Sequence, residues 1–212
     1  MLQKNTIESG TLELLNQLSV DPNLQNFCLA GGTALALQIG HRKSIDLDFF
    51  SLENFDTNSL LQYLESEYGF NMDYSALYTL KGHINSIKVE FISHKYPLVA
   101  PFVEYEKIKL YSIGDIAAMK LNAIAGNGTR SKDFIDIYFL LERYDIQSIV
   151  QFYEKKYQAR NLFHVLKSLS YFDDLQTIDW PVLVKQKELT LEDVEQRISD
   201  HMVKFLKENR LY

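Results

Sequence analysis

Two aspartates separated by one residue are the strongest candidates for chemistry in this sequence. Asp46 and Asp48 lie in the segment SIDLDFF, residues 44–50, where acidic and apolar residues alternate. Because side chains alternate across a β-strand, both carboxylates are expected on one face, opposite Ile45, Leu47 and Phe49. On its own, such a pair is usually a solvated strand face. Its surroundings favour a functional interpretation here.

A later strand pattern carries a third acid, Glu90, in the segment IKVEFI, residues 87–92. If the two strands are neighbours, three carboxylates converge. Two like charges about 4 Å apart repel by about 4 kcal/mol at an effective dielectric constant near 20. A divalent cation relieves this repulsion, and Mg²⁺ or Mn²⁺ bound by Asp46, Asp48 and Glu90 can assist phosphoryl transfer.

A double glycine precedes the acidic pair. The apolar run at residues 27–30 predicts a strand, followed by Gly31-Gly32-Thr33 and a short apolar helix that ends at Gly40. Glycine lets the backbone approach a phosphate closely, and a helix N-terminus attracts anions. Gly31, Gly32 and Thr33 are therefore candidate nucleotide-binding residues, although for two glycines alone an ordinary turn is the favoured interpretation.

Two cations lie between the helix and the acidic strand. Arg42 and Lys43 are close in sequence to the expected metal site. They are candidates to bind a triphosphate, and capping of the preceding helix is the alternative.

Lys120 is unusual because it lies in the middle of an apolar helix stripe. Ser112 is expected to cap this helix, and the stripe places Lys120 among isoleucines and alanines. A buried ammonium needs a partner or a ligand, which favours function over simple extension of the side chain to water. Asp136 lies in a narrow polar seam of the next helix, where a structural salt bridge with Lys132 is the alternative.

These motifs together resemble a known superfamily. Gly31-Gly32, thirteen intervening residues, Asp46-x-Asp48 and a later strand with Glu90 resemble nucleotidyltransferases of the polymerase-beta type. Within that superfamily, the segments GGTALAL, HRKSIDLDFF and KLNAIAGNGTRSKDFIDIYFLL resemble the AbiEii/AbiGii toxin family. The resemblance covers roughly residues 27–141.

The resemblance implies an enzyme that transfers a nucleoside monophosphate from an NTP to an acceptor. Asp46 and Asp48 would hold two Mg²⁺ ions. Glu90 would share the catalytic metal and assist deprotonation of the acceptor hydroxyl. Lys120 would offset triphosphate charge, and Asp136 would orient a basic group or contact a ligand, lining the cleft with Lys120.

Some assignments stay open. Asp133 is an alternative to Asp136 for the late aspartate of the family. The candidate acceptor is tRNA, and the candidate partner is a separately encoded antitoxin that forms no stable complex. Transfer to a protein or to a small molecule such as an antibiotic is an alternative, and so is a catalytically inactive nucleotide- or RNA-binding module.

Composition limits the remaining function classes. The 212 residues carry a net charge of −6, so nucleic-acid contact would need a local basic patch. The sole cysteine, Cys28, lies in an apolar run, which excludes an intramolecular disulfide. No apolar stretch approaches the ~20 residues that span a bilayer. We therefore expect a cytoplasmic protein without membrane contact.

The expected fold is α+β, with a nucleotidyltransferase fold of a small mixed sheet and a helical C-terminal half. We expect a catalytic core over residues 1–111 and a helical region over 112–212. A hairpin is predicted from strands 74–83 and 87–93, and Ser131 is expected to cap a helix over 132–143. Further helices are expected over 7–18, 60–68, 146–157 and 162–170, and from Thr190 onward.

Overall fold

The computed structural model describes residues 1–178 and 180–209. Its contacts divide the chain into two compact units. The sheet unit comprises Met1–Tyr96 and Pro101–Tyr111, and the helical unit comprises Pro97–Ala100 and the chain from Ser112 onward. No helix among the described residues is both long and apolar enough to cross a membrane.

The strands of the described residues form a seven-stranded sheet in the order β3-β4-β5-β2-β1-β7-β6. Their bounds are β1 Phe27–Ala30, β2 Leu47–Ser51, β3 Asn71–Ala76, β4 Thr79–Ile84, β5 Ile87–Ser93, β6 Val103–Tyr105 and β7 Ile108–Leu110. The pairs β2–β5 and β1–β7 are parallel, and the other neighbours are antiparallel. The mixed sheet expected from the sequence is confirmed.

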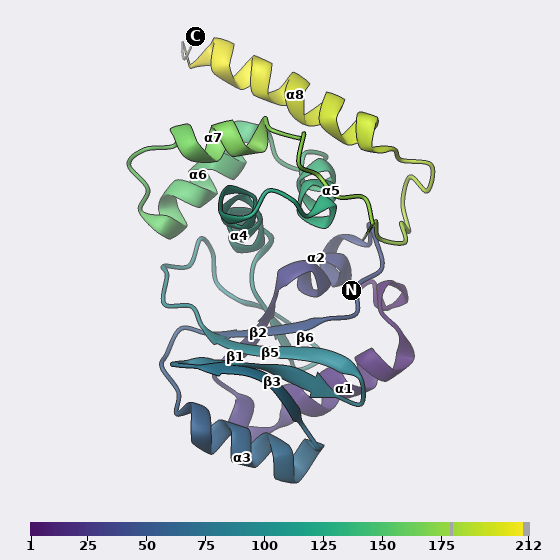
Figure 1. Ribbon diagram of the computed structural model, residues 1–212, viewed down its shortest axis with the longest axis vertical. Helices are drawn as coiled ribbons and strands as arrows, with labels where there is room; N and C mark the ends of the chain where they lie inside the picture. The colour runs from purple at the N-terminus through teal and green to yellow at the C-terminus, as the bar shows by residue number, and fades with distance from the viewer. Residues whose placement is uncertain (179, 210–212) are drawn as a thin grey trace. The chain divides into compact units, whose positions relative to one another are not determined.

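Helices pack against this sheet, with α2 above the strands and α3 below them in the view of Figure 1. The unit contains α1 Ser9–Val20, α2 Gly31–Ile39, α3 Thr57–Tyr68 and the short 3₁₀ helices Lys4–Thr6 and Pro22–Leu24. Gly40 and Gly69 end α2 and α3 in the left-handed conformation that glycine adopts without strain. The helix ends predicted at these glycines are confirmed.

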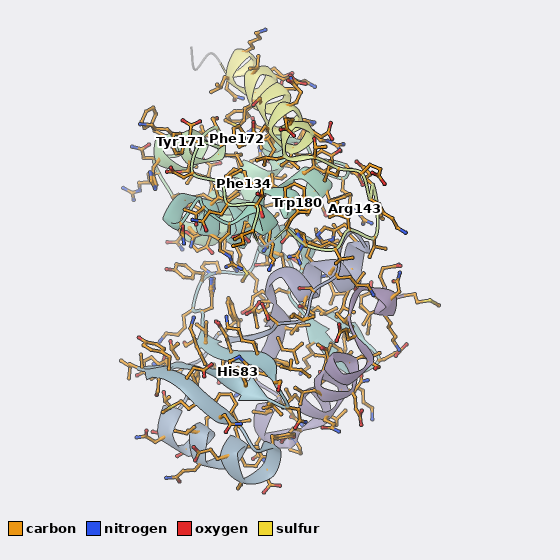
Figure 2. The ribbon with its side chains drawn as sticks, turned by 45° about the vertical axis from the view of Figure 1, so that its right-hand side comes forward. His83, Phe134, Arg143, Tyr171, Phe172 and Trp180 are labelled. Atoms are coloured by element: carbon orange, nitrogen blue, oxygen red, sulfur yellow. The ribbon has the colours of Figure 1, made fainter. Side chains whose placement is uncertain are left out.

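The helical unit is built around α4, Ile113–Gly126, which contacts α5, α6 and α7. The other helices are α5 Ser131–Leu140, α6 Ile146–Tyr157, α7 Phe163–Leu169 and α8 Leu191–Glu208. Phe134 of α5 packs against Phe172 with a ring separation of 5.6 Å (Figure 2). Thr190 and Asp193 form the predicted capping box of α8.

Two local predictions are wrong, and two strands are additional to the prediction. The segment predicted as one strand over 74–83 is two strands, because the chain turns at Leu77 and Tyr78 and adds β3 to the edge of the sheet. Ser131 does not cap α5; it is the first helical residue, and Arg130 occupies the cap position without a side-chain hydrogen bond. The short strands β6 and β7 were not predicted from the sequence.

The turn between β4 and β5 was placed correctly. Asn85 and Ser86 both have positive φ angles, of 50° and 65°. Two consecutive residues of this kind match the twist of a two-residue β-hairpin. The hairpin therefore fixes the register of the strand that carries Glu90.

The apolar face of the central strands forms the core of the sheet unit. Leu47, Phe49, Val89 and Phe91 are at most 3% exposed. Ile45, expected on the same face, is 55% exposed because it precedes β2 and lies outside the sheet. Burial raises the pKa of the Cys28 thiol to about 11, as befits a small core side chain.

Candidate active site

Asp48 and Glu90 lie side by side in the sheet. They are register partners of the parallel strands β2 and β5, and such strands are about 4.8 Å apart. Partners in register point to the same face. The expectation that the strand of Glu90 neighbours the strand of the acidic pair is therefore confirmed.

Asp46 lies two residues before Asp48, just outside the N-terminal end of β2. Both side chains are half-buried, in alternation with buried Leu47 and Phe49. Continuing the β2–β5 register by one step backward from Leu47 and Val89 sets Asp46 beside Lys88. Asp46, Asp48, Lys88 and Glu90 thus share one face of the two strands, and we call these four residues the acid face.

Glu90 is paired with two lysines. Its Oε1 lies 2.5 Å from the ammonium of Lys88, and its Oε2 lies 3.0 Å from that of Lys81, its register partner on β4. Burial alone raises the pKa of Glu90, but hydrogen bonds and charge from Lys88 and Lys81 outweigh it and hold the pKa below its usual value. The carboxylate is therefore ionised at neutral pH.

The aspartates also act on Lys88. Partial burial lowers the pKa of the Lys88 ammonium, but Glu90, Asp46 and Asp48 together raise it above its usual value. Lys88 is therefore charged and belongs electrostatically to the acid face. Sequence reasoning missed both lysines, although the alternation that assigned Glu90 to this face assigns Lys88 to it as well.

The acid face supplies oxygen ligands of the kind that Mg²⁺ and Mn²⁺ prefer. Among residues 1–178 and 180–209, however, no three acidic, histidine or cysteine side chains are already grouped to hold a metal ion. The reason is visible at Glu90, whose two oxygens both face ammonium groups. The three acids fit a divalent cation in type and strand position, and Glu90 must change partners to reach it.

The double glycine packs against this face. A methyl group on Gly31 would lie 2.0 Å from Oδ2 of Asp48, and one on Gly32 would lie 2.3 Å from Nη2 of Arg42. Gly31 also has a φ of +67° at the start of α2. Gly31 therefore needs glycine, because a side chain there would be strained and would meet the Asp48 carboxylate, whereas a side chain at Gly32 would displace the Arg42 guanidinium.

Thr33 ties the first turn of α2 to the segment before β2. Its hydroxyl donates to the carbonyl of Asp46 and lies 2.8 Å from the hydroxyl of Ser44. Arg42 is 3% exposed and donates to the carbonyl of Lys43 over 3.0 Å. Lys43 is exposed and donates to the carbonyl of Asn5.

In the helical unit, Lys120 meets two carboxylates. Its ammonium lies 2.6 Å from Oδ1 of Asp133 and 2.7 Å from Oδ2 of Asp136, and all three side chains are at most 9% exposed. The turn between α4 and α5 brings them together. The expectation that Lys120 and Asp136 find charged partners is confirmed, and Asp133 joins them.

A second buried ion pair was not predicted. Asp115 and Lys156 lie 2.8 Å apart with side chains that are 0% exposed. Ser112 does cap α4, but the Asp115 carboxylate binds Lys156 and the backbone N–H groups of Val99 and Ala100. A lysine on α6 with no sequence pattern of its own gave no signal for this pair.

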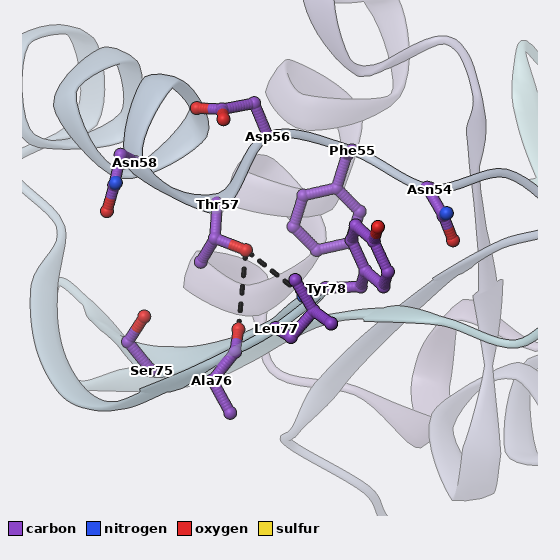
Figure 3. A pocket seen from close by; sticks show the side chains of 9 residues that line it. All are labelled: Asn54, Phe55, Asp56, Thr57, Asn58, Ser75, Ala76, Leu77 and Tyr78. Carbon is purple, nitrogen blue, oxygen red and sulfur yellow. Dashed lines mark hydrogen bonds between the residues drawn. The ribbon is translucent and has the colours of Figure 1, made fainter.

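The sheet unit also has a pocket of about 610 Å³ between the start of α3 and the β3–β4 turn (Figure 3). The hydroxyl of Thr57 bridges the turn, donating to the carbonyl of Ala76 over 3.3 Å and accepting from the N–H of Tyr78. The pocket is lined by Asn54, Phe55, Asp56, Thr57, Asn58, Ser75, Ala76, Leu77 and Tyr78. None of the expected site residues lines it.

Known proteins share this fold. A candidate nucleotidyltransferase of H. pylori superposes with a TM-score of 0.58 at 19% identity, covering 97% of this chain and 99% of that one. JHP933 of Helicobacter pylori superposes with a TM-score of 0.56 at 19% identity, covering 95% and 94%. At this identity the likeness establishes the fold.

Sequence comparison establishes the family. An uncharacterised protein of Aquifex aeolicus is 35% identical over 155 residues, which are 70% of this chain and 75% of that protein. Residues 13–210 match the family described as nucleotidyl transferase AbiEii toxin of the type IV toxin–antitoxin system. The chain belongs to the AbiEii nucleotidyltransferase toxin family. It is a nucleotidyltransferase, and the resemblance of its motifs to that family is confirmed.

Proposed function

We propose that this nucleotidyltransferase moves a nucleoside monophosphate from an NTP to an acceptor in a metal-dependent reaction centred on the acid face. The observation that supports this most directly is the pairing of Asp48 with Glu90 in register, beside a glycine turn that only fits when Gly31 has no side chain. Carboxylates on adjacent strands next to a helix N-terminus can hold a cation and a phosphate side by side.

Each residue has a distinct role in this proposal. Asp46 and Asp48 bind Mg²⁺ or Mn²⁺, which when bound neutralises charge on the reacting phosphate. Glu90 shares the metal and accepts the proton of the acceptor hydroxyl. The backbone at Gly31 and Gly32 approaches the β- and γ-phosphates.

The remaining candidate residues either position the glycine turn or are proposed to contact the nucleotide. Thr33 and Arg42 position the turn rather than the nucleotide, because both are buried and bonded to neighbouring backbone. Lys43 is exposed and is the better candidate for phosphate contact. In the helical unit, Lys120 is required for transfer, with Asp133 and Asp136 fixing the direction of its ammonium.

The family points to a toxin, so the acceptor proposed first is tRNA and the partner proposed is a separately encoded antitoxin that acts without a stable complex. Transfer to a protein or to a small molecule is the competing enzyme function. No structural observation favours it over tRNA.

The test offers each of the four labelled NTPs with Mg²⁺ or Mn²⁺, with and without total tRNA. Label in RNA supports the proposal, and label in protein alone replaces the acceptor. No label under any condition, together with no NTP-dependent change in melting temperature, overturns the proposal. A chelator control reports the metal dependence.

The variant Asp48→Asn tests whether the reaction takes place at the acid face. Removing one charge-stabilising group typically costs about 10²–10³ in rate. The apoprotein should not lose stability, because one of several crowded negative charges disappears. The exposed Asp173→Asn is the matched control and should transfer normally. Near-normal transfer by Asp48→Asn would contradict the assignment.

A further inference from the structure

Glu90 is held by two ammonium groups that differ in where they lie. Lys88 is two residues before Glu90 on β5 and therefore on the same face, with its Nζ 2.5 Å from Oε1. Lys81 approaches the other oxygen, Oε2, at 3.0 Å from β4. Each oxygen of the carboxylate thus has its own cation.

The strand order places Lys81 and Lys88 at different distances from the two aspartates. The order is β4-β5-β2, so Lys81 lies on the side of Glu90 that faces away from Asp48. Lys88 belongs to β5 itself, and the β2–β5 register continues so that Asp46 is its neighbour. Lys88 is therefore the lysine that lies within the acid face.

This placement gives Lys88 the electrostatic effect of a bound cation. Three carboxylates on two adjacent strands repel one another, and one ammonium among them offsets part of that repulsion. The pairing also occupies an oxygen that the proposed function assigns to the metal. An ammonium in direct contact occupies one lone pair of that oxygen, and its positive charge repels a metal ion that approaches the other, so the two cations compete for Glu90.

We propose that Lys88 is a positioning residue that occupies the cation's place in the metal-free acid face and is displaced from Glu90 when a divalent metal binds. The proposal rests on the proposed function, since it concerns the same metal site. It explains why the three acids are adjacent in register yet are not grouped as a ready metal site. Lys88 thereby stabilises the metal-free protein and weakens metal binding.

The test measures binding of Mn²⁺ alone, by electron paramagnetic resonance of the free ion, to five forms of the full chain. These are the unaltered protein, Lys88→Met, Lys88→Arg, Lys81→Met and Asp48→Asn. Lys88→Met should bind Mn²⁺ at least about fivefold more tightly, which corresponds to about 1 kcal/mol of relieved competition. Lys88→Arg keeps a competing cation and should stay within about twofold of the unaltered protein.

Lys81→Met is the matched control, because it removes the same charge from the same carboxylate on the side away from Asp48. It should tighten binding less than Lys88→Met does. Thermal melting provides a readout that is independent of metal affinity. Without metal, Lys88→Met should have a lower melting temperature than the unaltered protein, and added Mn²⁺ should raise its melting temperature by more.

Equal or weaker Mn²⁺ binding by Lys88→Met overturns the proposal, and so does equal tightening by both lysine variants. Failure of the proposed function has a different signature. In that case Asp48→Asn binds Mn²⁺ as well as the unaltered protein does, or neither protein binds it at all. Loss of binding in Asp48→Asn together with unchanged binding in Lys88→Met rejects the role of Lys88 alone.

Discussion

Helix α4 carries two buried ion-pair groups that are five residues apart in sequence and differ in their charge balance. Asp115 pairs with Lys156, one carboxylate with one ammonium, and both side chains are 0% exposed. Lys120 pairs with Asp133 and Asp136, two carboxylates with one ammonium, at up to 9% exposure. The first group has one charge of each sign, whereas in the second two carboxylates share one ammonium, with Arg130 4.0 Å from Asp133.

Asp115 and Lys156 make further hydrogen bonds besides their ion pair. Besides Lys156, the Asp115 carboxylate accepts from the N–H groups of Val99 and Ala100, at 2.9 and 3.2 Å, and from the hydroxyl of Ser112. Lys156 also donates to the carbonyl of Pro97. A fully bonded buried pair of this kind fixes structure, here by joining the Pro97–Ala100 segment to α4 and α6.

The Lys120 group is incompletely bonded. Oδ2 of Asp133 is buried, has no hydrogen-bond partner, and lies 4.0 Å from the nearest guanidinium nitrogen of Arg130. A buried carboxylate oxygen without a partner is unfavourable for stability. A buried carboxylate oxygen without a hydrogen bond is one of the features that mark catalytic or ligand-binding groups, which supports the role proposed for Lys120.

The largest effect is expected from Lys156→Met. Removing one partner of a fully buried pair leaves an uncompensated charge and costs about 3–5 kcal/mol of unfolding free energy. Urea denaturation measures this loss. Lys155→Met is the control, because the neighbouring Lys155 is exposed and binds only the carbonyl of Val99 in the described contacts, so its loss should cost less than about 1 kcal/mol. Similar losses in both variants would contradict the structural role of the buried pair.

The same variant tests the other half of the comparison. Transfer activity per folded molecule should be unchanged in Lys156→Met, measured at a temperature where the variant is folded. A large drop in that specific activity would show that the neutral pair is not purely structural.

The contrast between the two groups also shows what sequence could predict. Lys120 was detectable because it interrupts an apolar stripe, and Asp136 because it interrupts an apolar helix. Lys156 gave no such signal, since it lies near the C-terminal end of an amphipathic helix where lysine is ordinary. Its burial depends on the Pro97–Ala100 segment, a contact between residues far apart in sequence that no local pattern encodes.

In the sheet unit too, local patterns predicted some features, whereas contacts between distant segments were missed. Alternation and the double glycine were enough to predict β1, β2 and β5, the end of α2 and the neighbouring acids. The strands β6 and β7 could not be predicted, because each has three residues and too short a pattern. The lysine contacts of Glu90 needed the strand order and register, which depend on how distant segments pair.

A smaller stability effect, with a larger effect on activity, is expected from Lys120→Met. The side chain of Lys120 is 9% exposed and that of Lys156 is 0% exposed, so less burial is lost and the cost should be about 1–3 kcal/mol. If Lys120 acts on the substrate, transfer per folded molecule should fall at least about tenfold, a loss worth about 1.4 kcal/mol of transition-state stabilisation. Unchanged specific activity with reduced stability would place Lys120 in the same structural class as Lys156.

The smallest effect is expected from Asp133→Asn, compared with Asp136→Asn as its matched variant. Asp133 has one oxygen bonded to Lys120 and one without a hydrogen-bond partner, so its neutralisation removes an incompletely bonded buried charge as well as an ion pair. These two contributions oppose each other, and the unfolding free energy should change by less than about 1 kcal/mol. Asp136 is 0% exposed and would be the remaining counter-ion of Lys120. Its replacement should therefore lower both stability and transfer more than that of Asp133. Denaturation midpoints and transfer rates of the two purified variants decide the order, and the reverse order would assign the orienting role to Asp133.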